Sequence, residues 1–82
     1  MVFLAITTAG LGDALRLRRD AAVAVWCGSD AISEADYAAL NVANVSRFAY
    51  PLQGEDDDVI AGAIETVEEH HPNETVWVEW CA

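Results

Sequence analysis

The chain has 82 residues, of which 54% are hydrophobic, and a net charge of −10. A chain of this length forms one small domain, and this hydrophobic fraction is too high for a disordered protein even at such a charge. No apolar run approaches the roughly 18 residues that a membrane-spanning helix needs, and Met1–Ile6 lacks the basic residues of a signal peptide. We therefore expect a single cytosolic domain over residues 1–82, with Cys27 and Cys81 as reduced thiols.

The negative charge is concentrated in the last part of the chain. Residues 1–50 hold four arginines against five carboxylates, whereas residues 51–82 hold nine carboxylates and no basic residue. Such a surface repels nucleic acid and anionic membranes, and it attracts cations or basic protein surfaces. Adaptation to salt or a GC-rich genome explains the same acidity without any function, and both explanations stay open at this point.

The segment Glu55–His71 has the periodicity of an amphipathic helix. Apolar residues recur every three or four positions on one face, and glutamates fall on the other. The acidic run at its start stands where unpaired amide hydrogens and the helix dipole favour negative charge, and Pro72 ends the helix. We expect the apolar face to pack on a sheet and the carboxylates to point outward. The predicted partner-binding residues are Glu55, Asp56, Asp57, Asp58, Glu65, Glu68 and Glu69.

Two continuous apolar runs, residues 2–6 and 21–26, indicate strands that are covered on both faces. The first of them should be the central strand. A short helix over residues 14–19 joins them, which is the pattern of a right-handed βαβ crossover. Ser33 begins a second helix that runs to about Leu40.

A third strand is predicted over residues 45–50, where Pro51 ends it, and a last strand over residues 75–80, where Glu79 indicates a sheet edge. The sequence therefore predicts a β-α-β-α-β-α-β chain, a small three-layer α/β fold with a mostly parallel four-stranded sheet. The expected strand order is 2-1-3-4, and an antiparallel last strand is the alternative.

The first turn offers a phosphate site. Gly10-Leu11-Gly12 follows a strand and opens a helix, as the dinucleotide-binding fingerprint does. The third glycine of the fingerprint is replaced by Leu15, and Asp13 adds negative charge, so a tight structural turn is the competing explanation. If a phosphate or nucleotide ligand binds at this edge of the sheet, its predicted contacts are Thr8, Gly10, Gly12, Arg16, Cys27 and Asp30.

The remaining reactive residues form no complete set. Cys27 has no histidine near it in the sequence and lacks the arginine of a phosphatase loop, which favours a buried thiol. Glu68 and His71 have the Glu-x-x-His spacing of helix-borne metal sites, but a single such helix supplies too few ligands. We therefore expect no catalysis, no cofactor and no metal.

The aromatic residues suggest a further contact. Trp26 and Trp80 are expected in the core, whereas Trp77 shares a face with Glu79, where a helix or another chain can cover it. A homodimer through the last strand is therefore one of the expected partnerships.

Our leading hypothesis from the sequence is a non-catalytic binding protein whose acidic helix engages a basic protein surface. A narrower version is a nucleic-acid mimic of the phage counter-defence type, in which carboxylates take the place of phosphates in a basic groove. The alternatives are a phosphate- or nucleotide-binding module that uses residues 8–13, and a structural subunit of a larger assembly.

Overall fold

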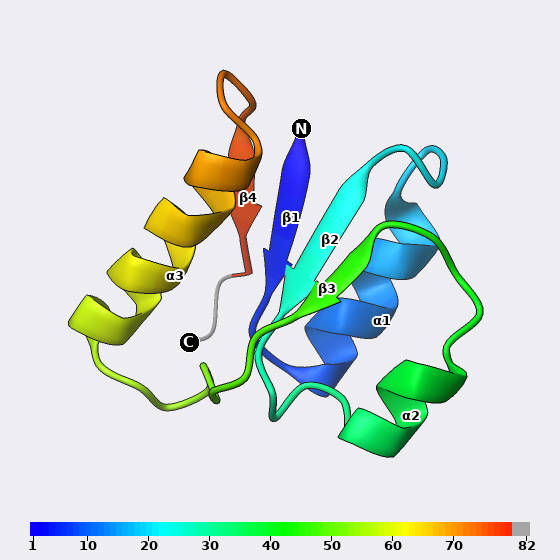
Figure 1. Ribbon diagram of the computed structural model, residues 1–82, viewed down its shortest axis with the longest axis horizontal. Coiled ribbons are helices and arrows are strands. Elements are labelled where there is room, and N and C mark those ends of the chain that lie inside the picture. Colours follow the sequence, from blue (N-terminus) through cyan, green and yellow to red (C-terminus); the bar gives the residue numbers. More distant parts are fainter. Residues whose placement is uncertain (80–82) are drawn as a thin grey trace.

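The computed structural model describes residues 1–79, in which a sheet lies between two layers of helices (Figure 1). The predicted α/β class and the alternation of strands and helices are confirmed. The elements in chain order are β1 (Val2–Ala5), α1 (Thr8–Leu17), β2 (Ala24–Cys27), α2 (Glu34–Ala39), β3 (Val45–Arg47), α3 (Asp57–His70) and β4 (Val76–Val78).

The sheet has the order β3-β2-β1-β4, and all its strand pairs are parallel. The predicted order 2-1-3-4 is wrong, because β3 pairs with β2 and β4 pairs with β1. The physical reason lies in burial: Val25 and Cys27 of β2 are fully buried, whereas all three residues of β3 are only half-buried, so the inner position goes to the more apolar strand. The inner position of β1, its pairing with β2 and the edge position of β4 agree with the prediction, and the antiparallel alternative for β4 is excluded.

The topology decides which face each helix covers. The chain moves from β1 to β3 in one direction and then returns across the sheet to β4, so right-handed crossovers place α1 and α2 on one face and α3 on the other (Figure 1). Each face has its own core. The core under α3 contains Val2, Leu4, Ile6, Phe48, Leu52, Ala63 and Val67. The core under α1 and α2 contains Ala5, Leu11, Val25, Cys27 and Ala31.

Helix α1 begins earlier than predicted. The Thr7 hydroxyl caps it by accepting a hydrogen bond from the Gly10 N–H at 3.0 Å, so the predicted turn over residues 8–13 is helical. Each glycine inside a helix costs about 1 kcal/mol relative to alanine, which is why the sequence pattern favoured a turn. The cap and the burial of Leu11 stabilise the helix against that cost.

Helix α3 begins at Asp57, two residues after the predicted start, because the Asp56 carboxylate caps it by accepting the Val59 N–H at 3.2 Å. Its apolar face packs on the sheet as predicted. Strands β3 and β4 are shorter than expected, and the expectations for Trp80 and Cys81 fall outside the described residues. Among the helices described, none has the length and apolar character required to cross a membrane.

Candidate functional site

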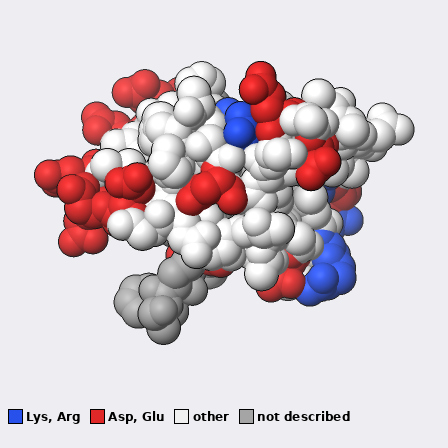
Figure 2. Space-filling model, turned by 90° about the horizontal axis from the view of Figure 1, so that it is seen from below, with Lys and Arg blue, Asp and Glu red and all other residues white. Residues whose placement is uncertain are grey.

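The carboxylates of α3 and the residues just before it form the acidic face, which consists of Glu55, Asp56, Asp57, Asp58, Glu65, Glu68 and Glu69. All seven side chains are exposed. Figure 2 shows carboxylates gathered on the left, over the N-terminal end of α3. Apart from the capping bond of Asp56, the side chains of this face make no hydrogen bond or ion pair within residues 1–79.

Three of the four arginines have contacts away from the acidic face. Arg16 pairs with Asp13 on α1. Arg18 donates to the carbonyl oxygens of Val23 and Ala43 at 3.1 and 2.9 Å. Arg47 donates to the carbonyl oxygens of Ile32 and Ser29 at 2.9 and 3.0 Å. Arg18 and Arg47 thus fix loops on the α1 and α2 side, so the fold itself does not neutralise the acidic face.

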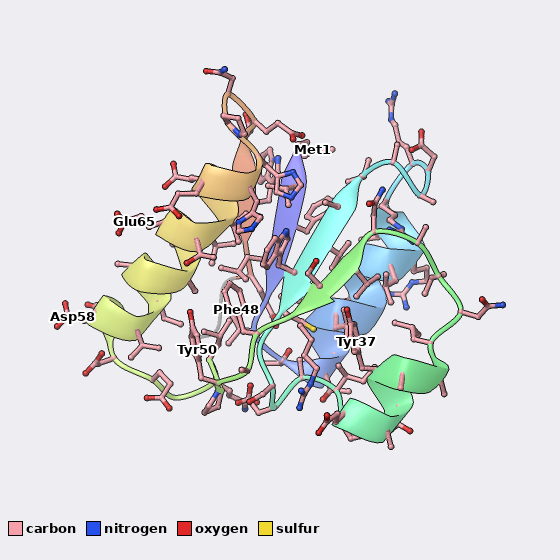
Figure 3. All side chains as sticks on the ribbon, viewed as in Figure 1. Met1, Tyr37, Phe48, Tyr50, Asp58 and Glu65 are labelled. Atoms are coloured by element: carbon pink, nitrogen blue, oxygen red, sulfur yellow. The ribbon has the colours of Figure 1, made fainter. Side chains whose placement is uncertain are left out.

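A hollow of about 380 Å³ opens beside the start of α3, and we call it the Tyr50 hollow. It is lined by Tyr50, Pro51, Glu55, Asp58, Val59 and Gly62. Figure 3 shows Phe48 and Tyr50 between the sheet and α3. Sequence reasoning predicted Glu55 and Asp58 as partner-binding residues but missed the hollow, because it assigned Tyr50 and Pro51 to the end of a strand.

An aromatic row holds Tyr50 in place. The ring centroids of Trp26 and Phe48 are 5.3 Å apart, and those of Phe48 and Tyr50 are 5.1 Å apart. Phe48 is buried, whereas Tyr50 is 39% exposed. The outermost ring of the row is therefore packed on one side and open to a ligand on the other.

At the first turn, the chain supplies its own anion. The Glu79 carboxylate accepts hydrogen bonds from the backbone N–H groups of Ile6 and Thr7 at 2.6 and 2.8 Å, and from the Thr7 hydroxyl at 2.5 Å. A Cβ atom at Gly10 would lie 2.0 Å from a Glu79 oxygen. The N–H of Gly10, one of the predicted phosphate contacts, is bonded to the Thr7 hydroxyl, and the Glu79 carboxylate lies against Gly10. Glu79 was expected only to protect the sheet edge.

The other residues predicted for the ligand site are dispersed. Thr8 and Gly12 are exposed on α1. Asp30 accepts the backbone N–H groups of Leu52 and Gln53, both at 3.1 Å, so its carboxylate fixes the loop before α3. Cys27 is fully buried. Burial raises the pKa of its thiol, and the charge of Arg47 acts in the opposite direction without cancelling that effect.

The histidines contact aromatic and acidic neighbours. The Trp26 indole N–H donates to Nε2 of His71 at 3.1 Å, and Nδ1 of His71 lies 3.1 Å from a Glu74 oxygen. Hydrogen bonds from the N-terminal amine and from His71 lower the pKa of Glu74. Within residues 1–79, no three His, Cys, Asp or Glu side chains lie close enough together to hold a metal ion.

A second hollow, of about 300 Å³, lies between α1 and the edge strand β4. Leu17 and Trp77 line it with Phe3, and they are 73% and 55% exposed. Trp77 was expected to lie under a helix or to contact another chain, and its side chain is more than half exposed beside α1.

Comparison of the chain with protein-family models, with curated proteins and with solved structures finds no match.

Proposed function

We propose that this protein is a non-catalytic binding protein that engages a basic protein surface through its acidic face. The observation that carries the proposal is that six of these seven carboxylates, all but Asp56, are exposed and make no contact with a cationic or hydrogen-bonding group within residues 1–79. A cationic surface on another molecule would supply the positive charge that residues 1–79 do not place beside these carboxylates.

The position of these carboxylates along α3 supports a role beyond folding. Negative charge near the first turn of a helix is favourable, because the dipole is positive there. Glu68 and Glu69 stand instead near the C-terminal end of α3, where the dipole is negative. Helix stability therefore explains Asp57 and Asp58, but it does not explain Glu68 and Glu69.

The narrower proposal is a nucleic-acid mimic. From Asp57 to Glu69 the helix rises by about 18 Å, which is close to five base-pair steps of about 3.4 Å each. A basic groove that normally holds a phosphate backbone could accept this row of carboxylates, as in inhibitors of the phage counter-defence type. The nature of the captured partner separates this proposal from the broader one.

The test is capture of partners from a lysate of the source organism at low and high salt. We expect the wild-type protein to retain a basic protein at low salt and to release it at high salt. The variant Glu65→Gln/Glu68→Gln should retain much less. The matched control Glu34→Gln/Asp36→Asn removes the same charge from exposed positions on α2 and should behave like the wild type. Equal capture by the two variants would overturn the proposal.

A second candidate, a structural subunit of a larger assembly or a homodimer through β4, is favoured by one observation. Trp77 and Leu17 are exposed, and both line the second hollow beside the edge strand β4. Light scattering of the wild type and of Trp77→Ser tests it, and a wild-type mass equal to one chain at high concentration would reject the homodimer. The phosphate-binding alternative has less support, because the Glu79 carboxylate lies against Gly10 and bonds the neighbouring amides of Ile6 and Thr7.

A further inference from the structure

We infer that the Tyr50 hollow binds an arginine side chain of the basic partner. This inference rests on the proposed function, since it names the group on the partner that the acidic face would bind most specifically. It is carried by the shape and composition of the hollow: one aromatic ring, two carboxylates, an apolar wall and a glycine.

The ring of Tyr50 is suited to stack on a flat cation. Its position is set by the neighbouring ring of Phe48, which is only 7% exposed and packs in turn on Trp26. A guanidinium group stacks on aromatic faces through cation–π attraction and planar contact. Because Tyr50 is already ordered, less conformational entropy is lost when the cation binds.

The charge of the hollow also favours a cation. Glu55 and Asp58 line it, and neither forms an ion pair within residues 1–79. The N-terminal end of α3 contributes roughly half a positive charge through the helix dipole. The four consecutive carboxylates from Glu55 to Asp58 exceed that contribution several-fold. A guanidinium can also bond a carboxylate through two parallel N–H groups, which an ammonium cannot do.

The remaining walls match the stem of an arginine. Pro51 and Val59 supply apolar surface against which a chain of methylene groups can lie. The backbone of Gly62 forms another part of the lining, and a Cβ built on it would have no atom within 4 Å. The volume of about 380 Å³ is near the lower end of small-ligand sites, roughly 300 to 1,000 Å³, which suits a single side chain.

The test uses N-acetyl-arginine methylamide as the probe, followed through backbone amide chemical shifts at low salt. Its lysine and citrulline counterparts are the comparison, because lysine keeps the charge without the plane and citrulline keeps the shape without the charge. We expect the arginine probe to shift the amides of Glu55, Asp58, Val59 and Gly62. The lysine probe should bind at least about fivefold more weakly than the arginine probe. The citrulline probe should cause no shift.

Two variants and one matched control locate the binding. Gly62→Leu places a side chain in the hollow and should abolish binding of the arginine probe. The variant should still fold, because leucine has a higher helix propensity than glycine. Ala61→Leu adds the same bulk at the adjacent exposed position of α3 and should leave binding unchanged. Tyr50→Leu should weaken binding about fivefold, the size of a surface cation–π contact. Circular dichroism confirms that each variant is folded.

The outcomes distinguish this inference from the proposed function. Arginine binding that survives Gly62→Leu, or equal binding of the lysine probe, would overturn the inference. The proposed function would then still depend on the capture experiment, since Glu65 and Glu68 do not line the hollow. Arginine binding in the hollow together with equal capture by the Glu65→Gln/Glu68→Gln variant and its control would overturn the proposed function alone.

Discussion

Glu79 and Thr7 are 72 residues apart in the chain, yet the Glu79 carboxylate accepts both the backbone N–H and the hydroxyl of Thr7. This contact joins the end of β4 to the turn between β1 and α1. The backbone also pairs here, since the Glu79 N–H donates to the Leu4 carbonyl oxygen at 2.9 Å. The last strand is therefore fixed to the sheet by a side chain as well as by its short ladder.

We predict that Glu79→Ala lowers the free energy of unfolding by about 1 to 3 kcal/mol, because the partly buried N–H groups of Ile6 and Thr7 lose their acceptor. Urea denaturation measures the change. Glu69→Gln, which removes one negative charge from an exposed position, is the control and should not destabilise the protein. Equal effects of the two substitutions would show that charge alone matters.

Two glycines of the same helix should respond to alanine with opposite signs. A Cβ at Gly12 meets no atom within 4 Å, so Gly12→Ala should stabilise the protein by about 1 kcal/mol. A Cβ at Gly10 would displace the Glu79 carboxylate from its donors, so Gly10→Ala should be destabilising. In a Glu79→Ala background that penalty should disappear. A Gly10→Ala penalty that persists there would contradict the role given to Glu79.

The contrast between these elements explains what the sequence could predict. The strands β1 and β2 are continuous apolar runs, a local pattern, and both were identified together with their pairing. The position of β3 depends on how much apolar surface of β2 has to be buried relative to the other strands. No local sequence pattern contains that comparison. The contact between Glu79 and Thr7 and the Tyr50 hollow each join residues from separate elements. The residue types could be read from the sequence, but the tertiary contacts between them could not.

The buried thiol of Cys27 gives a pH dependence with a defined sign. Burial raises its pKa above the ordinary value of 9.0, so the thiol of the unfolded chain ionises first as pH rises. The stability that this shift represents is fully present below the unfolded pKa and is lost as pH rises through the folded pKa. In a Cys81→Ser background, we expect the free energy of unfolding to fall as pH rises above the ordinary thiol pKa of 9.0. The same fall in Cys27→Ala/Cys81→Ser would assign it to other groups.

The placement of the carboxylates along α3 leads to a stability prediction that bears directly on the proposed function. Glu68 and Glu69 lie near the negative end of the α3 dipole, so Glu68→Gln/Glu69→Gln should raise the free energy of unfolding at low salt by about 0.5 kcal/mol or more. Asp57→Asn/Asp58→Asn makes the same charge change at the positive end of that helix, where the favourable dipole interaction is lost. The free energy of unfolding of Asp57→Asn/Asp58→Asn should therefore rise less, or fall.

Urea denaturation at low salt and at about 0.5 M salt measures both variants, and the difference between them should shrink at high salt because the charges are exposed and screened. A loss of stability in Glu68→Gln/Glu69→Gln would mean that these glutamates serve the fold, and the acidity at this end of α3 would then need no partner to explain it. A gain would mean that the chain retains two carboxylates that weaken its own helix, as expected for groups whose counter-charge lies on another molecule.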